Sequence, residues 1–310
     1  MPAAHPALRG LTVLERGWLS SNNILLHGAP GEGATLVDSG HSAHAEQTLA
    51  LVRHALIGGE PLARLVNTHL HSDHCGGNAA LQRAFGMPIL IPPGQWEAVL
   101  RWDEDALSYR PTGQRCDRFT AAAQIAPGTP LRCGGREWQV IESPGHDPDS
   151  VILFDAAQGV LISADALWEN GFGIVFPELE GERGFDDVAA VLDLIERLPV
   201  QWVLPGHGAA FGDVAAALAR ARSRLTGFRA DPQRHARHAA KVLLKYHVLE
   251  VLERPQSQLR SWFGATLLMQ GIWHRIGQPQ GDIDAWCDTL VAELAASGAL
   301  CVRDGTVHNT

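Results

Sequence analysis

Cysteine is scarce and scattered in this chain of 310 residues. The five cysteines form no CxxC pair, which argues against a disulfide framework and against a thiolate zinc site. Unpaired thiols of this kind fit a reducing compartment. They stand at Cys75, Cys116, Cys133, Cys287 and Cys301.

Long apolar runs are missing as well. No stretch of about 18 apolar residues occurs, so we expect no membrane span and no membrane partner. Residues 1–10 contain no apolar core of the kind that a signal peptide has. Because no targeting signal is visible, we expect a cytoplasmic protein.

Positive charge is in deficit. Lys and Arg number 25 against 34 Asp and Glu, which gives a net charge of −9 at pH 7. This balance argues against a general binder of polyanions, so nucleic acid is not the expected partner. Apolar residues make up 45% of the chain, enough for a sizeable core, and the length favours one large domain with a smaller one.

Short apolar runs alternate with helical patterns over the first two thirds of the chain. Turn residues separate these runs, and the alternation predicts an α+β domain of layered sheets and helices. The expected strands are residues 11–15, 23–26, 35–37, 64–67, 88–91, 137–142, 150–154, 159–163 and 202–204. The expected helices are residues 43–57, 78–83 and 186–198.

The character of the chain changes after about residue 213. Helical patterns cover residues 213–225, 237–252 and 282–297, and residues 299–307 read as a hairpin with an Asp-Gly turn. Three helices followed by a hairpin resemble a winged-helix unit. We place the boundary between residues 212 and 228, and divide the chain into a layered α+β domain, 1–218, and a helical C-terminal domain, 219–310.

Histidine is abundant, with fifteen in the chain, and one segment gathers metal-binding side chains. Its candidate ligands are His69, His71, Asp73 and His74. Because residues two apart in an extended segment point the same way, the first two histidines can reach one ion. The following Gly76-Gly77 pair is expected to let the backbone turn tightly and pack close to the metals. Imidazole and carboxylate ligands suit zinc, and also iron or manganese.

Three motifs downstream complete a family resemblance. They are Ser143-Pro144-Gly145-His146, the segment from Ser163 to Trp168, and Pro205-Gly206-His207-Gly208. Each alone reads as an ordinary loop or turn. In order after residues 68–77, they resemble the signature of the metallo-β-lactamase superfamily over residues 10–212.

The resemblance implies an αββα sandwich with a two-metal site at one edge, between the two sheets. The implied ligands of the first ion are His69, His71 and His146, those of the second are Asp73, His74 and His207, and Asp165 bridges the two. The implied cofactors are two divalent metal ions, Zn²⁺ first, with iron or manganese as alternatives.

Such a pair of ions, about 3.5–4 Å apart, would lower the pKa of a shared water toward about 7 and so supply a hydroxide nucleophile. Asp73 is the expected catalytic residue: it would orient the hydroxide and, as a hypothesis, later protonate the leaving group. Cys75 is expected to be a packed thiol and not a nucleophile.

The motifs leave the substrate open. An acidic protein with an apolar pocket favours a small acyl substrate, a thioester or an ester. Trp168, three residues after Asp165, is the best candidate for the pocket wall, followed by Phe172; the alternative for each aromatic ring is core packing.

The C-terminal helices resemble the extension of glyoxalase II-like and β-lactamase-like protein 2-like hydrolases. Some relatives with such an extension act on single-stranded RNA, so a nuclease for single-stranded RNA or DNA is one alternative. From Phe228 onward the chain has nine cationic and eight acidic residues, so its charge is nearly balanced. This balance favours a lid or a dimer element over a nucleic-acid binder. A homodimer stays open. Mono-iron persulfide dioxygenases and binding proteins with a degenerate site are the alternatives of another class.

Overall fold

The computed structural model describes residues 5–29, 31–279 and 281–310. The strands of the first sheet are β1 Leu11–Leu14, β2 Asn23–Leu26, β3 Ala34–Val37, β4 Leu62–Val66, β5 Ile89–Ile91 and β6 Ala121–Gln124. Those of the second sheet are β7 Leu131–Cys133, β8 Arg136–Glu142, β9 Val151–Asp155, β10 Val160–Ala164 and β11 Trp202–Pro205. The sheet orders are β1-β2-β3-β4-β5-β6 and β11-β10-β9-β8-β7.

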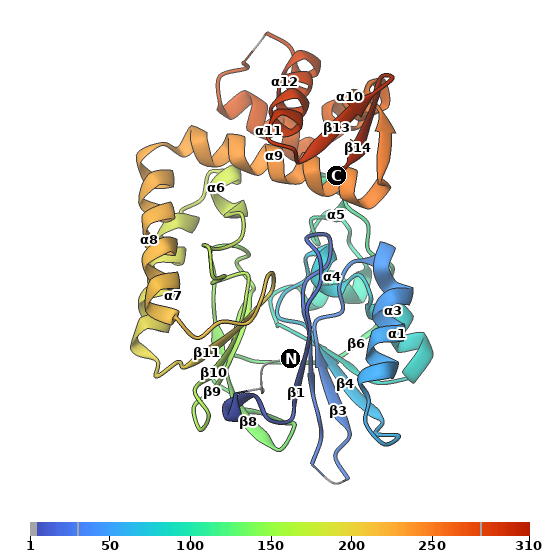
Figure 1. The fold of residues 1–310 in the computed structure, drawn as a ribbon, viewed down its shortest axis with the longest axis vertical. Coiled ribbons are helices and arrows are strands. Elements are labelled where there is room, and N and C mark those ends of the chain that lie inside the picture. Colours follow the sequence, from blue (N-terminus) through green and yellow to red (C-terminus); the bar gives the residue numbers. More distant parts are fainter. Residues whose placement is uncertain (1–4, 30, 280) are drawn as a thin grey trace.

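Helices cover the outer faces of both sheets (Figure 1). The helices of this part are η1 Pro6–Leu8, η2 Ser42–His44, α1 Ala45–Ala55, α2 Ser72–Cys75, α3 Asn78–Phe85, α4 Trp96–Arg101, α5 Tyr109–Thr112, α6 Phe176–Glu180, α7 Gly184–Arg197 and α8 Val214–Ala230. Helices α1 and α3 lie outside the first sheet, and α7 and α8 lie outside the second (Figure 1). The expected α+β class and αββα sandwich are confirmed.

Apolar side chains fill all three interfaces of the sandwich. Between α1 and the first sheet lie Leu25, Leu36, Leu49, Val52 and Leu65. Between the sheets lie Leu26, Val37, Trp138, Val140, Leu153 and Ile162. Between the second sheet and its helices lie Phe154, Leu161, Val191, Ile195, Leu218 and Leu225. Each fully buried side chain of this kind contributes about 1.5–3 kcal/mol. Strands β9 and β10 are buried on both faces, which is why both read as largely apolar runs.

The expected strands and long helices of this part all occur, within a few residues. Strands β6 and β7 and helices α4, α5 and α6 were not expected. Each is only three to six residues long, too short for a periodic pattern to show.

The C-terminal region comprises α9 Pro232–Val251, β12 Glu253–Pro255, α10 Gln256–Ala265, α11 Leu267–Arg275, α12 Ile283–Ala296, β13 Leu300–Arg303 and β14 Thr306–Asn309. Its three strands form a sheet of order β12-β14-β13. The predicted helices and hairpin are present, whereas β12, α10 and α11 were not predicted. Gly264 and Gly271 lie inside these two short helices and weaken their helical signal.

Helix α9 runs across the end of both sheets and carries the rest of the C-terminal region above it (Figure 1). The proposed boundary after residue 218 lies inside α8, whose Leu218 and Leu225 both pack into the outer layer of the second sheet. The division at that residue stays a prediction. Among the described residues no helix is both long enough and apolar enough to cross a membrane.

Candidate metal centre

Parallel strand pairs align the loops that carry the candidate ligands. Strand β10 pairs with β11 so that Ala164 lies opposite Pro205, which brings the next residues of both loops together. Strand β3 pairs with β4 so that Val37 lies opposite Val66. The loops after β4, β8, β10 and β11 therefore meet at one edge of the sandwich.

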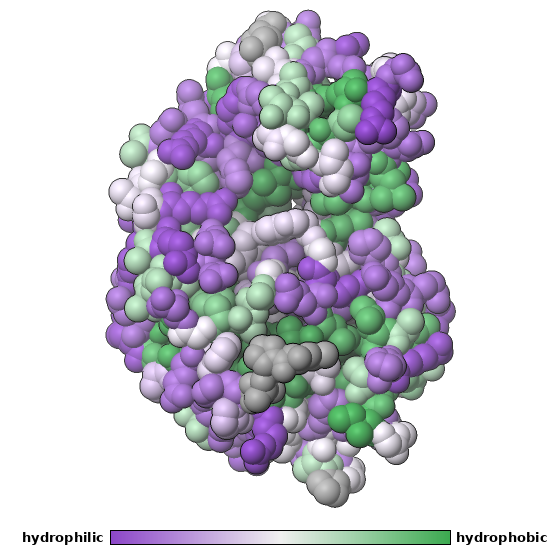
Figure 2. All heavy atoms as spheres, in the orientation of Figure 1, coloured by the Kyte–Doolittle hydropathy of each residue, from purple (hydrophilic) through white to green (hydrophobic). Residues whose placement is uncertain are grey.

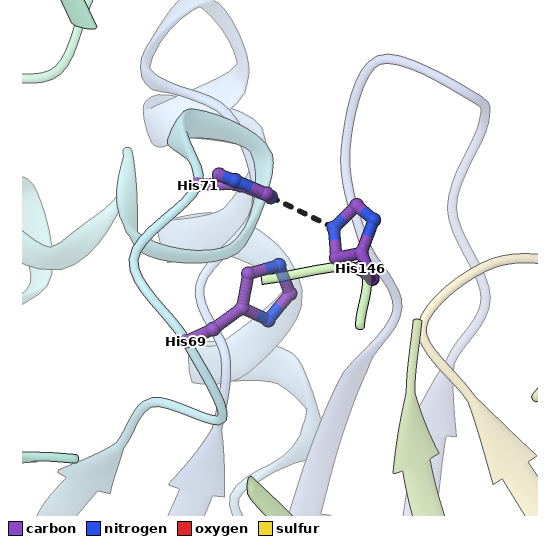
Figure 3. A group of neighbouring side chains, drawn as sticks. All are labelled: His69, His71 and His146. Atoms are coloured by element: carbon purple, nitrogen blue, oxygen red, sulfur yellow. Dashed lines mark hydrogen bonds between the residues drawn. The ribbon is translucent and has the colours of Figure 1, made fainter. Parts of the chain in front are cut away.

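The structure brings all the expected ligands together there, in two groups. The first is His69, His71 and His146; the second is Asp73, His74, Asp165 and His207. Within each group the candidate ligand atoms all lie within 4.8 Å of one another. Figure 3 shows the three rings of the first group turned toward a common point.

Polar partners on the far side of each imidazole leave its other nitrogen to act as a ligand in the first group. The Thr68 hydroxyl accepts from His69 Nδ1 at 3.1 Å, and the Ile174 carbonyl accepts from His146 Nδ1 at 2.6 Å. Asp147 Oδ2 lies 3.5 Å from His71 Nε2. Such partners fix the tautomer of a metal-binding histidine.

The converging nitrogens of the first group fit a metal cation. His71 Nδ1 lies 2.8 Å from His146 Nε2 (Figure 3), and His69 Nε2 is buried without any partner. Burial, chiefly, lowers the pKa of His71 and of His146 to about 4, so both imidazoles are neutral at pH 7. Neutral imidazole nitrogens that converge in this way are suited to bind a metal ion.

Asp165 touches both groups. Its Oδ1 lies 3.4 Å from His74 Nε2 in the second group, and its Oδ2 lies 3.4 Å from His146 Nε2 in the first. Burial would raise the pKa of Asp165, but His74 and His207 outweigh it and hold the pKa well below its ordinary value. An ionised carboxylate in this place can bridge two cations.

Negative charge dominates the second group. His207 Nε2 lies 3.1 Å from Asp73 Oδ2. Burial opposes the charged form of His74, yet Asp165, Asp38 and Asp73 together raise its pKa well above the ordinary value. Buried carboxylates that force a proton onto a histidine favour a metal cation in the same way. The nitrogen and oxygen donors of both groups thus suit a pair of divalent ions.

Asp38 supports the site, and the sequence patterns did not single it out. Its Oδ2 accepts from His74 Nδ1 at 2.8 Å and from the Thr68 hydroxyl at 2.8 Å, while Oδ1 accepts from the Thr68 amide at 2.9 Å. Asp38 has φ of +57°, and the sequence pattern indicated only a turn residue. A carboxylate directly after a buried strand was the available signal.

The Gly76-Gly77 pair serves close packing and not a tight turn, which corrects the expectation. Both residues have ordinary negative φ, −62° and −81°. A Cβ on Gly76 would lie 2.4 Å from the Ser42 amide, and one on Gly77 would lie 2.4 Å from the Ser39 carbonyl. The glycines therefore let α2 approach the backbone of residues 39–42, and their nearest neighbours are not the candidate ligands.

A cavity of about 570 Å³ opens onto both groups. Trp168 and Phe172 both line it, as expected, although Phe172 also packs in the core beneath. Trp168 Nε1 donates to Asp165 Oδ1 at 3.2 Å. Trp18, which was not expected, stacks on His207 with ring centroids 5.6 Å apart. Figure 2 shows this face of the molecule hollowed beneath the C-terminal region, with hydrophobic residues at the rim.

Helix α9 forms the far wall of the cavity. Its Leu243, Tyr246 and Leu249 line the space. The Tyr246 hydroxyl lies 2.9 Å from Ser72 Oγ, which in turn donates to Gln114 Oε1 at 2.7 Å. The C-terminal region therefore contacts the very segment that carries His71 and Asp73.

Cys75 is fully buried, and its Sγ lies 3.3 Å from the carbonyls of Leu70 and His71. Burial raises its pKa well above the ordinary value. The neutral thiol packs behind the site, and the role expected for it agrees with this placement.

Residues 16–207 match the family model described as the metallo-beta-lactamase superfamily. The chain belongs to this superfamily. Among curated relatives, the hydroxyacylglutathione hydrolase of Bradyrhizobium sp. (strain ORS 278) is 30% identical over 159 residues, 51% of this chain and 52% of that protein. Acyl-coenzyme A thioesterase MBLAC2 of Homo sapiens is 28% identical over 165 residues, 47% of this chain and 56% of that protein. The chain thus spans only about half of the length of these relatives.

Solved structures of the superfamily share the fold. The metallo-beta-lactamase family protein TTHA1429 from Thermus thermophilus is 18% identical with a TM-score of 0.56, and the match covers 97% of this chain and 99% of that one. TTHA1623, solved in a di-iron-bound form, is 27% identical with a TM-score of 0.54, covering 68% of this chain and 98% of that one. A superfamily site of this kind is suited to two metals, and the metal identity is not set by the fold.

Proposed function

We propose that this protein is a metal-dependent hydrolase that cleaves an acyl thioester or, less well, an ester. One observation carries the proposal: the two groups of ligands share Asp165 at the floor of an apolar cavity. The names of the thioesterase and hydroxyacylglutathione hydrolase relatives agree with acyl thioester chemistry.

His69, His71 and His146 would hold one ion, Asp73, His74 and His207 the other, with Asp165 between them. When bound, two divalent ions, Zn²⁺ first among the candidates, polarise the substrate carbonyl and acidify a water molecule. The side chains of this protein supply the rest: they orient the water, bind the acyl chain and exclude bulk solvent.

Asp73 orients the attacking water by accepting its hydrogen bond. Burial opposes the ionised form, but His74 and the hydrogen bond from His207 lower the pKa of Asp73 to about 2. Asp73 is therefore a carboxylate at neutral pH, able to take a proton from the attacking water and pass it to the leaving group. A thiol has a pKa of about 8.5 and departs as the thiolate, whereas an alkoxide needs a proton. This difference favours thioesters over esters.

The C-terminal region acts as the lid in this proposal. Its strand order, β12-β14-β13 with helices before and between, supports a winged-helix-like interpretation. Since α9 forms the cavity wall, the region meets a small acyl substrate directly. A homodimer and a cytoplasmic location stay predictions.

The test is turnover by protein loaded separately with zinc, iron or manganese. We expect acyl thioesters to be hydrolysed faster than matched oxygen esters, and labelled single-stranded RNA and DNA to remain intact. Rapid cleavage of the nucleic acids with no thioester turnover would establish the nuclease alternative. Oxygen consumption with a persulfide by protein holding one iron would establish the dioxygenase alternative.

A further inference from the structure

We propose that Arg224, on the wall of the same cavity, binds an anionic group of the substrate, a carboxylate or a phosphate. The inference rests on the proposed function and narrows its substrate class. The substrate would be an acyl thioester that carries an anionic group within the span of the cavity.

Arg224 is a half-buried cation with only neutral partners. Its Nη1 donates to the Asn170 carbonyl at 3.4 Å, and its Nη2 donates to His238 Nε2 at 2.7 Å. Its guanidinium carbon lies 5.7 Å from the Phe172 ring centroid and 5.4 Å from that of Phe228. Within the part of the chain that the structure describes, no carboxylate oxygen lies within 4.0 Å of it.

The next arginine on the same helix shows the contrast. Arg222 does not line the cavity and pairs with two carboxylates, Asp193 at 2.6 Å and Glu196 at 2.8 Å. An arginine placed for stability alone gains partners of this kind. Arg224 instead bears the cost of partial desolvation with no counter-charge, and burial lowers its pKa.

His238 adds no positive charge to the wall and holds the guanidinium in place. Because its Nε2 accepts from Arg224, the imidazole must be neutral. Burial, chiefly, with Arg224 and Lys241 adding to it, lowers the pKa of His238 to about 4. A guanidinium that lies against two aromatic rings and donates to two neutral acceptors keeps its remaining N–H donors for a planar anion.

None of the other charged side chains that line this wall forms an ion pair with Arg224. Lys241 is paired with Glu293 at 2.7 Å, and Lys245 donates to the Ala299 carbonyl and to Asn309. Glu169 is the one further carboxylate lining the cavity besides the candidate ligands, among described residues, and it is exposed. This end of the cavity keeps a positive balance that an anion would complement.

The loop between β10 and α6 contacts both Arg224 and the first ligand group, and so limits the distance between them. A Cβ on Gly171 would lie 2.7 Å from Arg224 Nη1, and one on Gly173 would lie 2.4 Å from His146 Nδ1. Two residues of chain span at most about 7 Å. With the two Cα–Cβ bonds and the two contacts added, Arg224 Nη1 lies at most about 15 Å from His146 Nδ1, a distance that an extended small-molecule substrate can span.

The test compares thioesters that share an acetyl group and differ in the thiol: neutral N-acetylcysteamine, carboxylated 3-mercaptopropionate and phosphorylated phosphopantetheine. We expect Arg224→Gln to raise KM for one or both anionic substrates at least about tenfold, with kcat and the neutral substrate unchanged. Arg224→Lys should recover part of the loss, and the matched control Arg222→Gln should change nothing. The preferred anionic arm identifies carboxylate or phosphate.

Binding supplies a readout that does not depend on turnover. The thioether analogue of each substrate, with CH₂ in place of the carbonyl, should quench the fluorescence of Trp18 and Trp168, which line the cavity. Arg224-dependent binding of the anionic thioethers without thioester hydrolysis would overturn the proposed function and leave the anion site standing. Hydrolysis of neutral and anionic thioesters alike, unaffected by Arg224→Gln, would overturn the anion site and leave the function standing.

Discussion

At the scale of single residues, three of the candidate histidines have one nitrogen for a ligand and one for the protein. His69, His74 and His146 use Nδ1 toward a hydroxyl, a carboxylate and a carbonyl, and each leaves Nε2 facing the centre. The supporting partners matter because a rotated or wrongly protonated ring cannot bind metal.

His71→Ala should remove one ligand of the first ion. We expect the metal content to fall by about one ion per chain and hydrolysis to fall more than about 100-fold, because even supporting partners cost 10–100-fold. Elemental analysis and turnover measure both effects. His54→Ala, at an exposed histidine, is the matched control. Full activity in metal-loaded His71→Ala protein would show that His71 is not a ligand.

Asp38→Asn keeps the shape of the side chain and replaces one of the two acceptor oxygens, which receive from His74 and Thr68, by an NH₂ donor. The amide NH₂ would meet an N–H donor there, so we expect metal affinity at the second group to fall about 10–100-fold. Competition with a chromophoric chelator measures this affinity. Unchanged affinity would mean that Asp38 only shapes the loop.

At the scale of elements, α9 joins two roles. Its polar end reaches the metal-ligand segment through Tyr246, and its apolar face closes the cavity and packs on the C-terminal helices. A helix that shares its side chains between a site and a core couples the two.

Tyr246→Phe should test this coupling. The hydroxyl bonds Ser72, so its loss should lower the free energy of unfolding by about 1 kcal/mol in urea titration. Metal content should stay at the wild-type value, since no ligand is removed. A fall in metal content with unchanged stability would place Tyr246 in the metal centre instead.

At the scale of the whole molecule, neutral histidines lie at the junction between sandwich and C-terminal region. His235 on α9 is buried, and its Nε2 accepts from the Val175 amide at 3.2 Å. Burial, chiefly, with His238 and Arg224, lowers its pKa to about 4. Protonation would break that hydrogen bond at the junction.

Stability should therefore fall as the pH falls. In the unfolded chain His235 is protonated near pH 6.5, but in the folded chain only near pH 4. The contribution of neutral His235 to the free energy of unfolding is therefore fully present above pH 6.5 and is lost as the pH falls from 6.5 to 4. For His235 alone the loss between pH 7 and pH 5 is about 2 kcal/mol. Urea unfolding at both pH values measures this loss, and in His235→Gln the free energy of unfolding should fall by that much less between pH 7 and pH 5. If His235→Gln lost as much stability between pH 7 and pH 5 as the wild-type protein, His235 would not be the group that titrates.

The amino-acid sequence by itself determined the class of fold, the cluster of candidate ligands from His69 to His74, and the order of the later motifs. These features are local: strand patterning and ligand spacing are written within a few residues. Short elements such as α10 and α11 escaped because a few turns with internal glycine carry little periodic signal.

Only the tertiary structure decided which distant side chains meet. The pairing of β3 with β4 sets Asp38 beside Thr68, the fold of α9 sets Tyr246 over Ser72, and α8 sets Arg224 on Phe172. None of these residues carries a local pattern that differs from a turn, a core position or a solvated helix face. Their roles arise from long-range contacts, which depend on how the sheets and helices pack and not on neighbours along the chain.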